Sequence, residues 1–221
     1  MSVVVSSHYN NIDYFIMRNV DMSLTKTAKI LTSKQSELVL THLSIHSRNP
    51  LRDQLIFLLS IKCGLRAKEI ACVCWDMVLD SDGMISDSIG ITNQVSKGKT
   101  GGRIIPLNKF LKSTLIEFYN TQKNHRTFDV RGNIISTQRS TRTSPQVIVN
   151  LFSVWYKDLN LIGCSSHSGR RTFITNCSRK ISTVGGSLKD VQYLSGHSSL
   201  QTTQRYIELN QESKNRVVDL I

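Results

Sequence analysis

Acidic residues are scarce in this sequence. Its 221 residues include 28 Lys and Arg but only 16 Asp and Glu, which gives a formal net charge of +12 at pH 7. Such a surplus of basic charge is found most often in proteins that bind nucleic acid, and next most often in proteins that bind anionic membranes. Composition alone leaves open a plainer interpretation, in which the charge only keeps the protein soluble.

Long hydrophobic runs and targeting signals are also missing. The most apolar stretch, LIFLLSI, is too short to cross a bilayer. The start, MSVVVSSHYNN, lacks the basic and apolar regions of a signal peptide. No amphipathic helix with a Lys/Arg face stands out, which argues against a membrane-surface protein. These features predict a cytoplasmic, nucleoid-associated protein without a membrane partner.

The cysteines do not have the spacing of a metal site. Cys72 and Cys74 are separated by one residue instead of two, and no second Cys/His pair lies nearby. Because the cysteines are odd in number and sit within apolar runs, we expect reduced, buried thiols and no metal ion. The five are Cys63, Cys72, Cys74, Cys164 and Cys177.

The spacing of apolar residues predicts a mostly helical chain. Thr32 with Gln35 fits a capping box at a helix start, and Gly64 fits a helix end. Ser144 before Pro145 is typical of another start. The predicted helices are about 33–46, 51–63, 67–72, 109–122, 145–159, 168–180, 187–195 and 199–209.

Glycines punctuate short apolar runs between residues 75 and 107, which predicts a small antiparallel sheet with a hairpin at 97–102. No internal repeat or long linker is visible. The expected fold class is therefore mainly α with a small antiparallel β-sheet (α+β), in one domain. Residues 1–28 are expected to form an arm or a short strand, and residues 211–221 a tail helix.

Two short patterns place basic residues at turns. Arg66 lies in the sequence GLRAKE between two predicted helices. Residues 96–103, SKGKTGGR, form a basic hairpin tip without the G-x-x-x-x-G-K-[ST] spacing of a phosphate-binding loop. Taken singly, each has an ordinary explanation: a capping or surface Arg, and a solvated turn.

Two further patterns bring a histidine near another reactive group. His167 and Arg170 share one face of the helix that starts there, and helix N-termini bind phosphate. His197 and Tyr206 fall on neighbouring short helices. Taken singly, these are an ordinary helix start, a core histidine and a half-buried tyrosine.

In combination, the order of these residues resembles the tyrosine recombinase (phage integrase) family over about residues 30–210. The family's motifs are G-L-R-x-x-E, a lysine hairpin before R-x-[IV]-P-L, H-x-x-R, and L-x-G-H followed nine residues later by a tyrosine. The matching residues, in order, are Arg66 and Glu69, Lys97 and Arg103, His167 and Arg170, His197, and Tyr206.

The resemblance implies a DNA breaking-rejoining fold and a strand transfer without metal, cofactor or ATP. Tyr206 is the implied nucleophile, which forms a 3′-phosphotyrosine bond. Arg66 and Arg170 are implied to hold the scissile phosphate, for which the planar guanidinium is well suited. His197 is expected to donate a hydrogen bond to that phosphate, and His167 to accept or relay the tyrosine proton.

The remaining site residues are assigned by the same resemblance. Lys97 is expected to protonate the leaving 5′-hydroxyl, with Lys99 as the alternative. Glu69 is expected to orient the arginines and not to react. The expected DNA contacts are Lys99, Arg103, Arg139, Arg142 and Arg171.

The resemblance also implies partners and domain organisation. We expect double-stranded DNA at a specific site as the partner, bound by a homotetramer that is a monomer or dimer when free. Residues 29–210 would be the catalytic domain, and a separate N-terminal core-binding domain is not expected, as in the fimbrial phase-variation recombinases. The resemblance also implies a mobile element as the carrier of the gene.

Two other functions are compatible with this sequence. A type IB topoisomerase-like enzyme would use the same chemistry to relax supercoils without a specific site. A DNA-binding accessory protein derived from a recombinase would not turn over, although an incomplete set of catalytic residues would be expected in that case.

Overall fold

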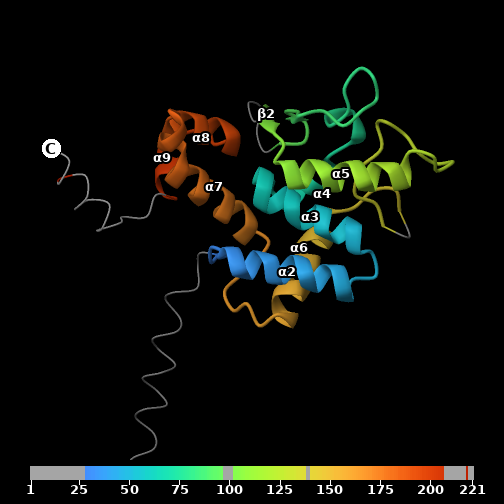
Figure 1. The fold of residues 1–221 in the computed structure, drawn as a ribbon, viewed down its shortest axis with the longest axis horizontal. Helices are drawn as coiled ribbons and strands as arrows, with labels where there is room; N and C mark the ends of the chain where they lie inside the picture. Colours follow the sequence, from blue (N-terminus) through green and yellow to red (C-terminus); the bar gives the residue numbers. More distant parts are fainter. Residues whose placement is uncertain (1–27, 97–101, 138–139, 207–217, 219–221) are drawn as a thin grey trace, which may run out of the picture.

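The computed structural model describes residues 28–96, 102–137, 140–206 and 218. Most of these residues are helical (Figure 1). In this part of the chain, every helix is too short or too polar to cross a bilayer. The elements are α2 (Ser33–His46), α3 (Pro50–Cys63), α4 (Ala67–Cys72), η1 (Trp75–Met77), β1 (Ser88–Ile91), β2 (Arg103–Pro106), α5 (Lys109–Gln122), α6 (Pro145–Asp158), α7 (Ser168–Lys180), η2 (Ile181–Val184), α8 (Leu188–Ser195) and α9 (Leu200–Gln204).

Helix α3 is the centre of the core. Its residues from Leu55 to Ile61 are all buried, because α2, α5 and α7 pack around it (Figure 1). The helix ends at Gly64, whose φ of 65° is in the left-handed region that glycine adopts without strain. This turn separates α3 from α4 and brings Arg66 to the start of α4.

Local capping residues start the helices where the sequence predicts them. The Thr32 hydroxyl accepts a hydrogen bond from the backbone N–H of Gln35, whose side chain accepts one from the Thr32 N–H. The side chains of Asn108 and Ser144 cap α5 and α6 in a similar manner. These contacts satisfy N–H groups that have no partner within the helix.

The predicted sheet has two antiparallel strands. β1 and β2 pair so that Ser88 lies opposite Pro106 and Ile91 opposite Arg103. Side chains alternate along β2: Arg103 and Ile105 point into the protein and Ile104 points to solvent. The tip of the predicted hairpin, with Lys97 and Lys99, lies outside the described residues.

The helix expected at 199–209 ends at Gln204, and Tyr206 lies in the turn that follows. All five cysteines are free thiols, but only Cys63 is fully buried, whereas the other four are half-buried. The predicted arm, apart from residue 28, and nearly all of the predicted tail helix lie outside the described residues.

Candidate active site

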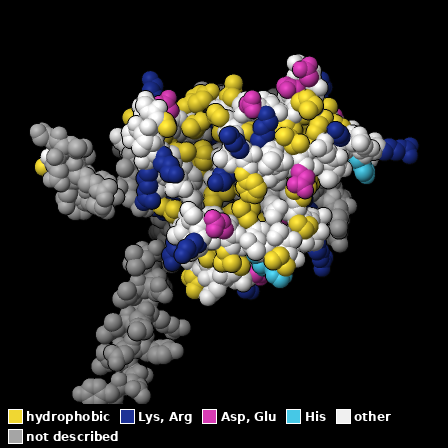
Figure 2. All heavy atoms as spheres, in the orientation of Figure 1, with side chains coloured by type: hydrophobic (Ala, Val, Ile, Leu, Met, Phe, Trp, Pro, Cys, Tyr) yellow, Lys and Arg dark blue, Asp and Glu magenta, His cyan; other side chains and the backbone are white. Residues whose placement is uncertain are grey.

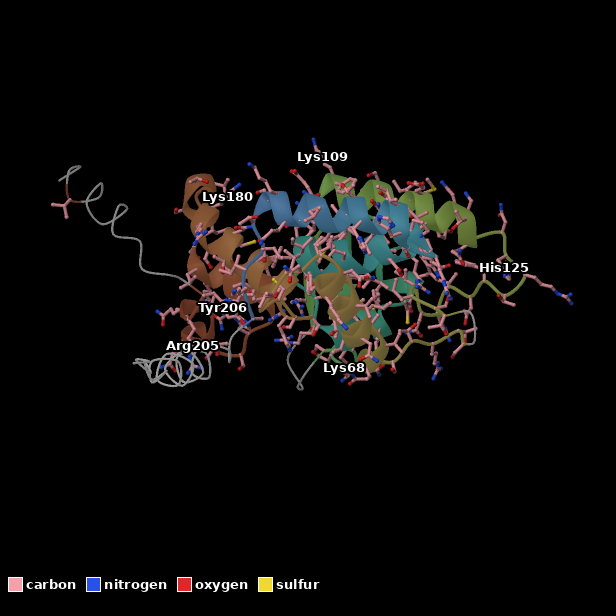
Figure 3. The ribbon with its side chains drawn as sticks, turned by 90° about the horizontal axis from the view of Figure 1, so that it is seen from below. Lys68, Lys109, His125, Lys180, Arg205 and Tyr206 are labelled. Atoms are coloured by element: carbon pink, nitrogen blue, oxygen red, sulfur yellow. The ribbon has the colours of Figure 1, made fainter. Side chains whose placement is uncertain are left out.

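The predicted catalytic residues that the structure describes meet where α4 and α7 begin and where α8 ends. Tyr206 and Arg205 lie on the same side of the molecule as Lys68 of α4, and on the side opposite Lys109 and Lys180 (Figure 3). A hollow of about 600 Å³ opens here. It is lined by Ala28, Gly163, Cys164, Ser165, His167, Arg170, Arg171, Thr202, Arg205 and Tyr206.

Arg66 is held in place by Glu69. The carboxylate of Glu69 accepts hydrogen bonds from the Arg66 backbone N–H at 2.8 Å and from Arg66 Nη1 at 3.1 Å. Glu69 is only 1% exposed, whereas 24% of the Arg66 side chain remains exposed. Burial alone would raise the Glu69 pKa, but hydrogen bonds and charge from Arg103 and Arg66 outweigh it and hold the pKa below its ordinary value.

Arg170 is a buried cation at the floor of the hollow. Its Nη1 donates to the Gly64 carbonyl at 2.6 Å, and its Nη2 donates to the Ser195 carbonyl at 2.7 Å. Burial, with repulsion from Arg66, lowers its pKa to about 10, so that Arg170 is still protonated at neutral pH. Arg170 therefore joins three segments: the end of α3, the start of α7 and the end of α8.

His197 and Tyr206 lie face to face. Their ring centroids are 5.4 Å apart and their planes differ by 26°. His197 Nδ1 is 3.0 Å from the Thr203 hydroxyl, which leaves Nε2 available for another partner. Burial and, after it, the charges of Arg170, Arg66 and Arg103 lower the His197 pKa to about 4. The ring is therefore neutral at pH 7.

His167 is the N-cap of α7 and lines the hollow together with Tyr206. Partial burial, followed by the charges of Arg170 and Arg66, lowers its pKa below 6.5. A neutral imidazole of this kind accepts a proton, as a general base does.

One predicted DNA contact, Arg103, lies in the interior of the protein. Arg103 was expected to be a surface contact, but its side chain is only 1% exposed. Its Nη1 and Nη2 donate to the two carboxylate oxygens of Glu69 at 3.0 and 3.2 Å, and its Nε donates to the Leu194 carbonyl at 2.9 Å. The guanidinium therefore faces inward, toward Glu69 and the end of α8.

The other predicted DNA contacts vary in exposure. Arg142 is exposed. Arg171 is half-buried, and its Nη1 donates to the Ala28 carbonyl at 3.0 Å. Lys99 and Arg139 lie outside the described residues, as does the predicted catalytic residue Lys97.

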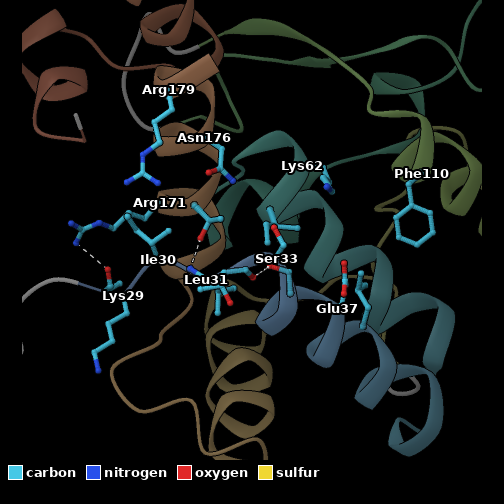
Figure 4. Close-up of a pocket in the computed structure, with 16 residues that line it drawn as sticks. Lys29, Ile30, Leu31, Ser33, Glu37, Lys62, Phe110, Arg171, Asn176 and Arg179 are labelled. Atoms are coloured by element: carbon cyan, nitrogen blue, oxygen red, sulfur yellow. Dashed lines mark hydrogen bonds between the residues drawn. The ribbon is translucent and has the colours of Figure 1, made fainter. Parts of the chain in front are cut away.

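A larger hollow of about 970 Å³ lies elsewhere, between α2, α3, α5 and α7 (Figure 4). Figure 2 looks onto the face that carries α2 and α5, where Lys and Arg side chains alternate with hydrophobic ones. The hollow is bordered by Lys29, Lys62, Phe110 and Arg179, and its lining includes no histidine, cysteine or tyrosine. The smaller hollow at Tyr206 is therefore the candidate active site.

The model of the phage integrase family matches residues 29–213 of this chain. The chain belongs to the phage integrase family. The matched range contains every predicted catalytic residue.

Curated relatives include the tyrosine recombinase XerC of Roseiflexus castenholzii, 27% identical over 197 residues. That alignment covers 85% of this chain and 57% of the relative. The tyrosine recombinase XerA of Pyrococcus horikoshii is 25% identical, with 76% of this chain and 54% of the relative covered. The chain thus spans about half the length of the curated relatives it matches.

Solved structures show the same fold. The crystal structure of XerA recombinase aligns with a TM-score of 0.67 and 18% sequence identity. The alignment covers 89% of this chain and 64% of the XerA chain. The structure of the transposon Tn1549 integrase in complex with a circular-intermediate DNA aligns with a TM-score of 0.67 and 21% sequence identity. That alignment covers 92% of this chain and 70% of the Tn1549 integrase chain. The expected tyrosine recombinase fold is therefore confirmed.

Sequence reasoning missed two contacts in the site. Thr203, whose hydroxyl lies against His197, carries no motif of its own. The inward orientation of Arg103 had a visible signal, because it is two residues from the apolar Ile105 on a strand, where alternate side chains share a face.

Proposed function

We propose that this chain is the catalytic domain of a site-specific recombinase that cleaves and rejoins DNA through Tyr206. The observation that carries the proposal is the pairing of Tyr206 with His197 beside Arg170 and His167, around one hollow. The assignment of residues 29–210 to this domain belongs to the same proposal.

The first step is attack of the Tyr206 oxygen on a phosphodiester, which expels a 5′-hydroxyl and leaves a 3′-phosphotyrosine. Charge builds up on the non-bridging oxygens in the transition state. Arg66 and Arg170 neutralise this charge, and each well-placed donor of this kind contributes roughly 3–4 kcal/mol. The carbonyl contacts of Arg170 hold its guanidinium in position before substrate arrives.

The two histidines have different roles in this mechanism. His197 Nδ1 lies 3.0 Å from the Thr203 hydroxyl. In the tautomer that this mechanism uses, the hydroxyl donates to Nδ1, and the N–H at Nε2 donates a hydrogen bond to the phosphate. His167 takes the proton of the Tyr206 hydroxyl, since an un-ionised phenol is a poor nucleophile.

Departure of the 5′-hydroxyl requires an acid, and Lys97 is the proposed donor, with Lys99 as the alternative. The phosphotyrosine retains the energy of the broken bond, so a second DNA strand attacks it without ATP. Attack by a new partner strand yields a recombinant, whereas attack by the original strand restores the substrate.

DNA binding is the partner interaction of this proposal. Arg142 and Arg171 remain candidate contacts, and Lys68 and Arg205, exposed on the side of Tyr206, are added to them (Figure 3). Each neutralised phosphate steepens the salt dependence of binding by about 0.9 in log–log slope. We propose assembly of a homotetramer on the DNA, with the tail at 211–221 docking on a neighbouring protomer.

Covalent capture tests this function. Tagged wild-type protein and Tyr206→Phe are expressed in the source cell and denatured, and the attached DNA is sequenced. We expect adducts from the wild type only, clustered at one sequence. Adducts at random sequences would support the topoisomerase alternative, and no adduct from folded wild-type protein would support the accessory protein.

A further inference from the structure

Arg103 is buried in the protein interior and connects Glu69 of α4 with the end of α8, two parts of the proposed active site. Two of its nitrogens bind both oxygens of the Glu69 carboxylate, and the third binds the Leu194 carbonyl. These contacts use the planar fork of a guanidinium, which no other side chain provides. With 1% of the side chain exposed, water does not compete for any of them.

The contact with Glu69 leads to Arg66. One carboxylate accepts hydrogen bonds from both arginines, at 3.0 and 3.2 Å from Arg103 and at 2.8 and 3.1 Å from Arg66. Because Glu69 is buried, loss of Arg103 would leave its charge with a single cationic partner, in a place that water does not reach. The carboxylate would then turn toward Arg66 or solvent, and Arg66 would move with it.

The contact with Leu194 leads to His197. The last carbonyls of α8 have no partner within the helix, and they favour cations. Arg103 binds the carbonyl of Leu194 and Arg170 that of Ser195. Gly196 follows with a φ of 60°, and a Cβ there would lie 2.8 Å from Arg103 Nη1. The chain therefore packs directly on the guanidinium, one residue before His197.

We propose that Arg103 is a positioning residue of the active site, which fixes Arg66 through Glu69 and His197 through the end of α8. This inference rests on the proposed function, since it assigns a task in the same reaction. Three guanidinium groups and one carboxylate leave a net charge of +2 in this cluster. Arg103 thus also contributes to the positive potential that the phosphate meets.

The test compares two conservative substitutions. Arg103→Lys keeps the charge but cannot bridge Glu69 and Leu194 together. Arg52→Lys is the matched control, because Arg52 also binds a buried carboxylate, that of Asp53, with Nε at 2.8 Å and Nη2 at 2.7 Å, but at the far end of α3. Thermal unfolding of both variants, and of the wild type, shows how much of any change is general stability.

The first readout is the rate of adduct formation on the DNA recovered by covalent capture. We expect Arg103→Lys to slow the reaction by roughly a hundredfold, as small misplacements of catalytic groups do. Arg52→Lys should keep the wild-type rate at temperatures where it is folded. Equal rates for folded Arg103→Lys and wild type would overturn the inference, and so would a rate loss that merely follows the melting temperature in both variants.

The second readout needs no DNA, so it separates this inference from the proposed function. The proteins are titrated with inorganic phosphate, and the ring signals of His167 and His197 are followed by NMR. We expect Arg103→Lys to weaken phosphate binding by roughly tenfold, the effect of one misplaced charge-assisted hydrogen bond. Absence of adducts from wild-type protein would refute the proposed function alone, whereas unchanged phosphate affinity in Arg103→Lys would refute the positioning role.

Discussion

At the two ends of this molecule, side chains of different kinds are buried. Around Trp75, the side chains of Phe118, Tyr119 and Phe128 pack with ring centroids 5.2 to 6.0 Å apart. Around Arg170, buried charged and polar groups are joined by directed hydrogen bonds, such as those from Arg170 to the Gly64 and Ser195 carbonyls. Figure 3 shows how far apart the ends are, with His125 at one and Tyr206 at the other.

The difference separates burial that stabilises the fold from burial that holds side chains in defined positions. Apolar burial gains free energy in proportion to area and tolerates changes of shape. A buried charge gains little net stability, but it holds its partners in defined places, since a missing partner leaves an uncompensated charge. We therefore expect substitutions at the aromatic end to change stability, and those at the charged end to change the reaction.

The largest effect is expected for Arg170→Lys. A lysine cannot reach both the Gly64 and Ser195 carbonyls, and it offers the phosphate a point charge in place of a fork. Adduct formation should fall by about 10²–10³-fold. The free energy of unfolding should fall by about 1–3 kcal/mol, because a buried carbonyl loses its donor. A wild-type adduct rate in this variant would contradict the role given to the charged end.

The aromatic end is tested by Phe118→Ala. This ring is 8% exposed and stacks on Trp75 at 6.0 Å, so its removal leaves a cavity. We expect a loss of about 3–5 kcal/mol in the free energy of unfolding, measured with urea. The adduct rate per folded molecule should be unchanged. A selective loss of rate would show that the two ends are coupled.

Gly64→Ala probes the boundary between the ends. Its φ of 65° is strained for alanine, and the new Cβ would lie 2.4 Å from Phe173 Cδ1. Gly83→Ala is the control, because Gly83 has a similar φ of 73° and open space around it. The control should cost about 1–2 kcal/mol in unfolding free energy from backbone strain alone. Gly64→Ala should cost more, and it should also slow adduct formation, since Arg170 binds the Gly64 carbonyl.

The smallest effect is a pH dependence from His197. Its pKa is about 4 in the folded protein and 6.5 ordinarily, so between these values the unfolded chain binds a proton that the folded chain does not. Stability is therefore unaffected above about pH 6.5 and declines as the pH falls toward 4. Melting temperatures across this range should decline less steeply in His197→Gln than in the wild type. Identical slopes would show that His197 titrates normally.

Much of the site could be predicted from the sequence, because the motifs are short and local. Capping residues such as Thr32 and the left-handed Gly64 act on their own neighbours, which explains why the ends of α2, α3 and α4 agree with prediction. The end of α9 was predicted less well. The expected helix ran past Tyr206, whereas the tyrosine lies in a turn beside His197.

By itself, the sequence determined the helical pattern, the small antiparallel sheet and the order of the candidate catalytic residues, since these follow from spacing along the chain. Only the tertiary structure decided what each arginine does. Strand alternation indicates that Arg103 faces inward but not what it binds: Arg103 is buried against Glu69, whereas Arg142 is exposed. The physical reason is that the partners of a buried charge come from distant segments: Glu69 is 34 residues from Arg103, and Leu194 is 91.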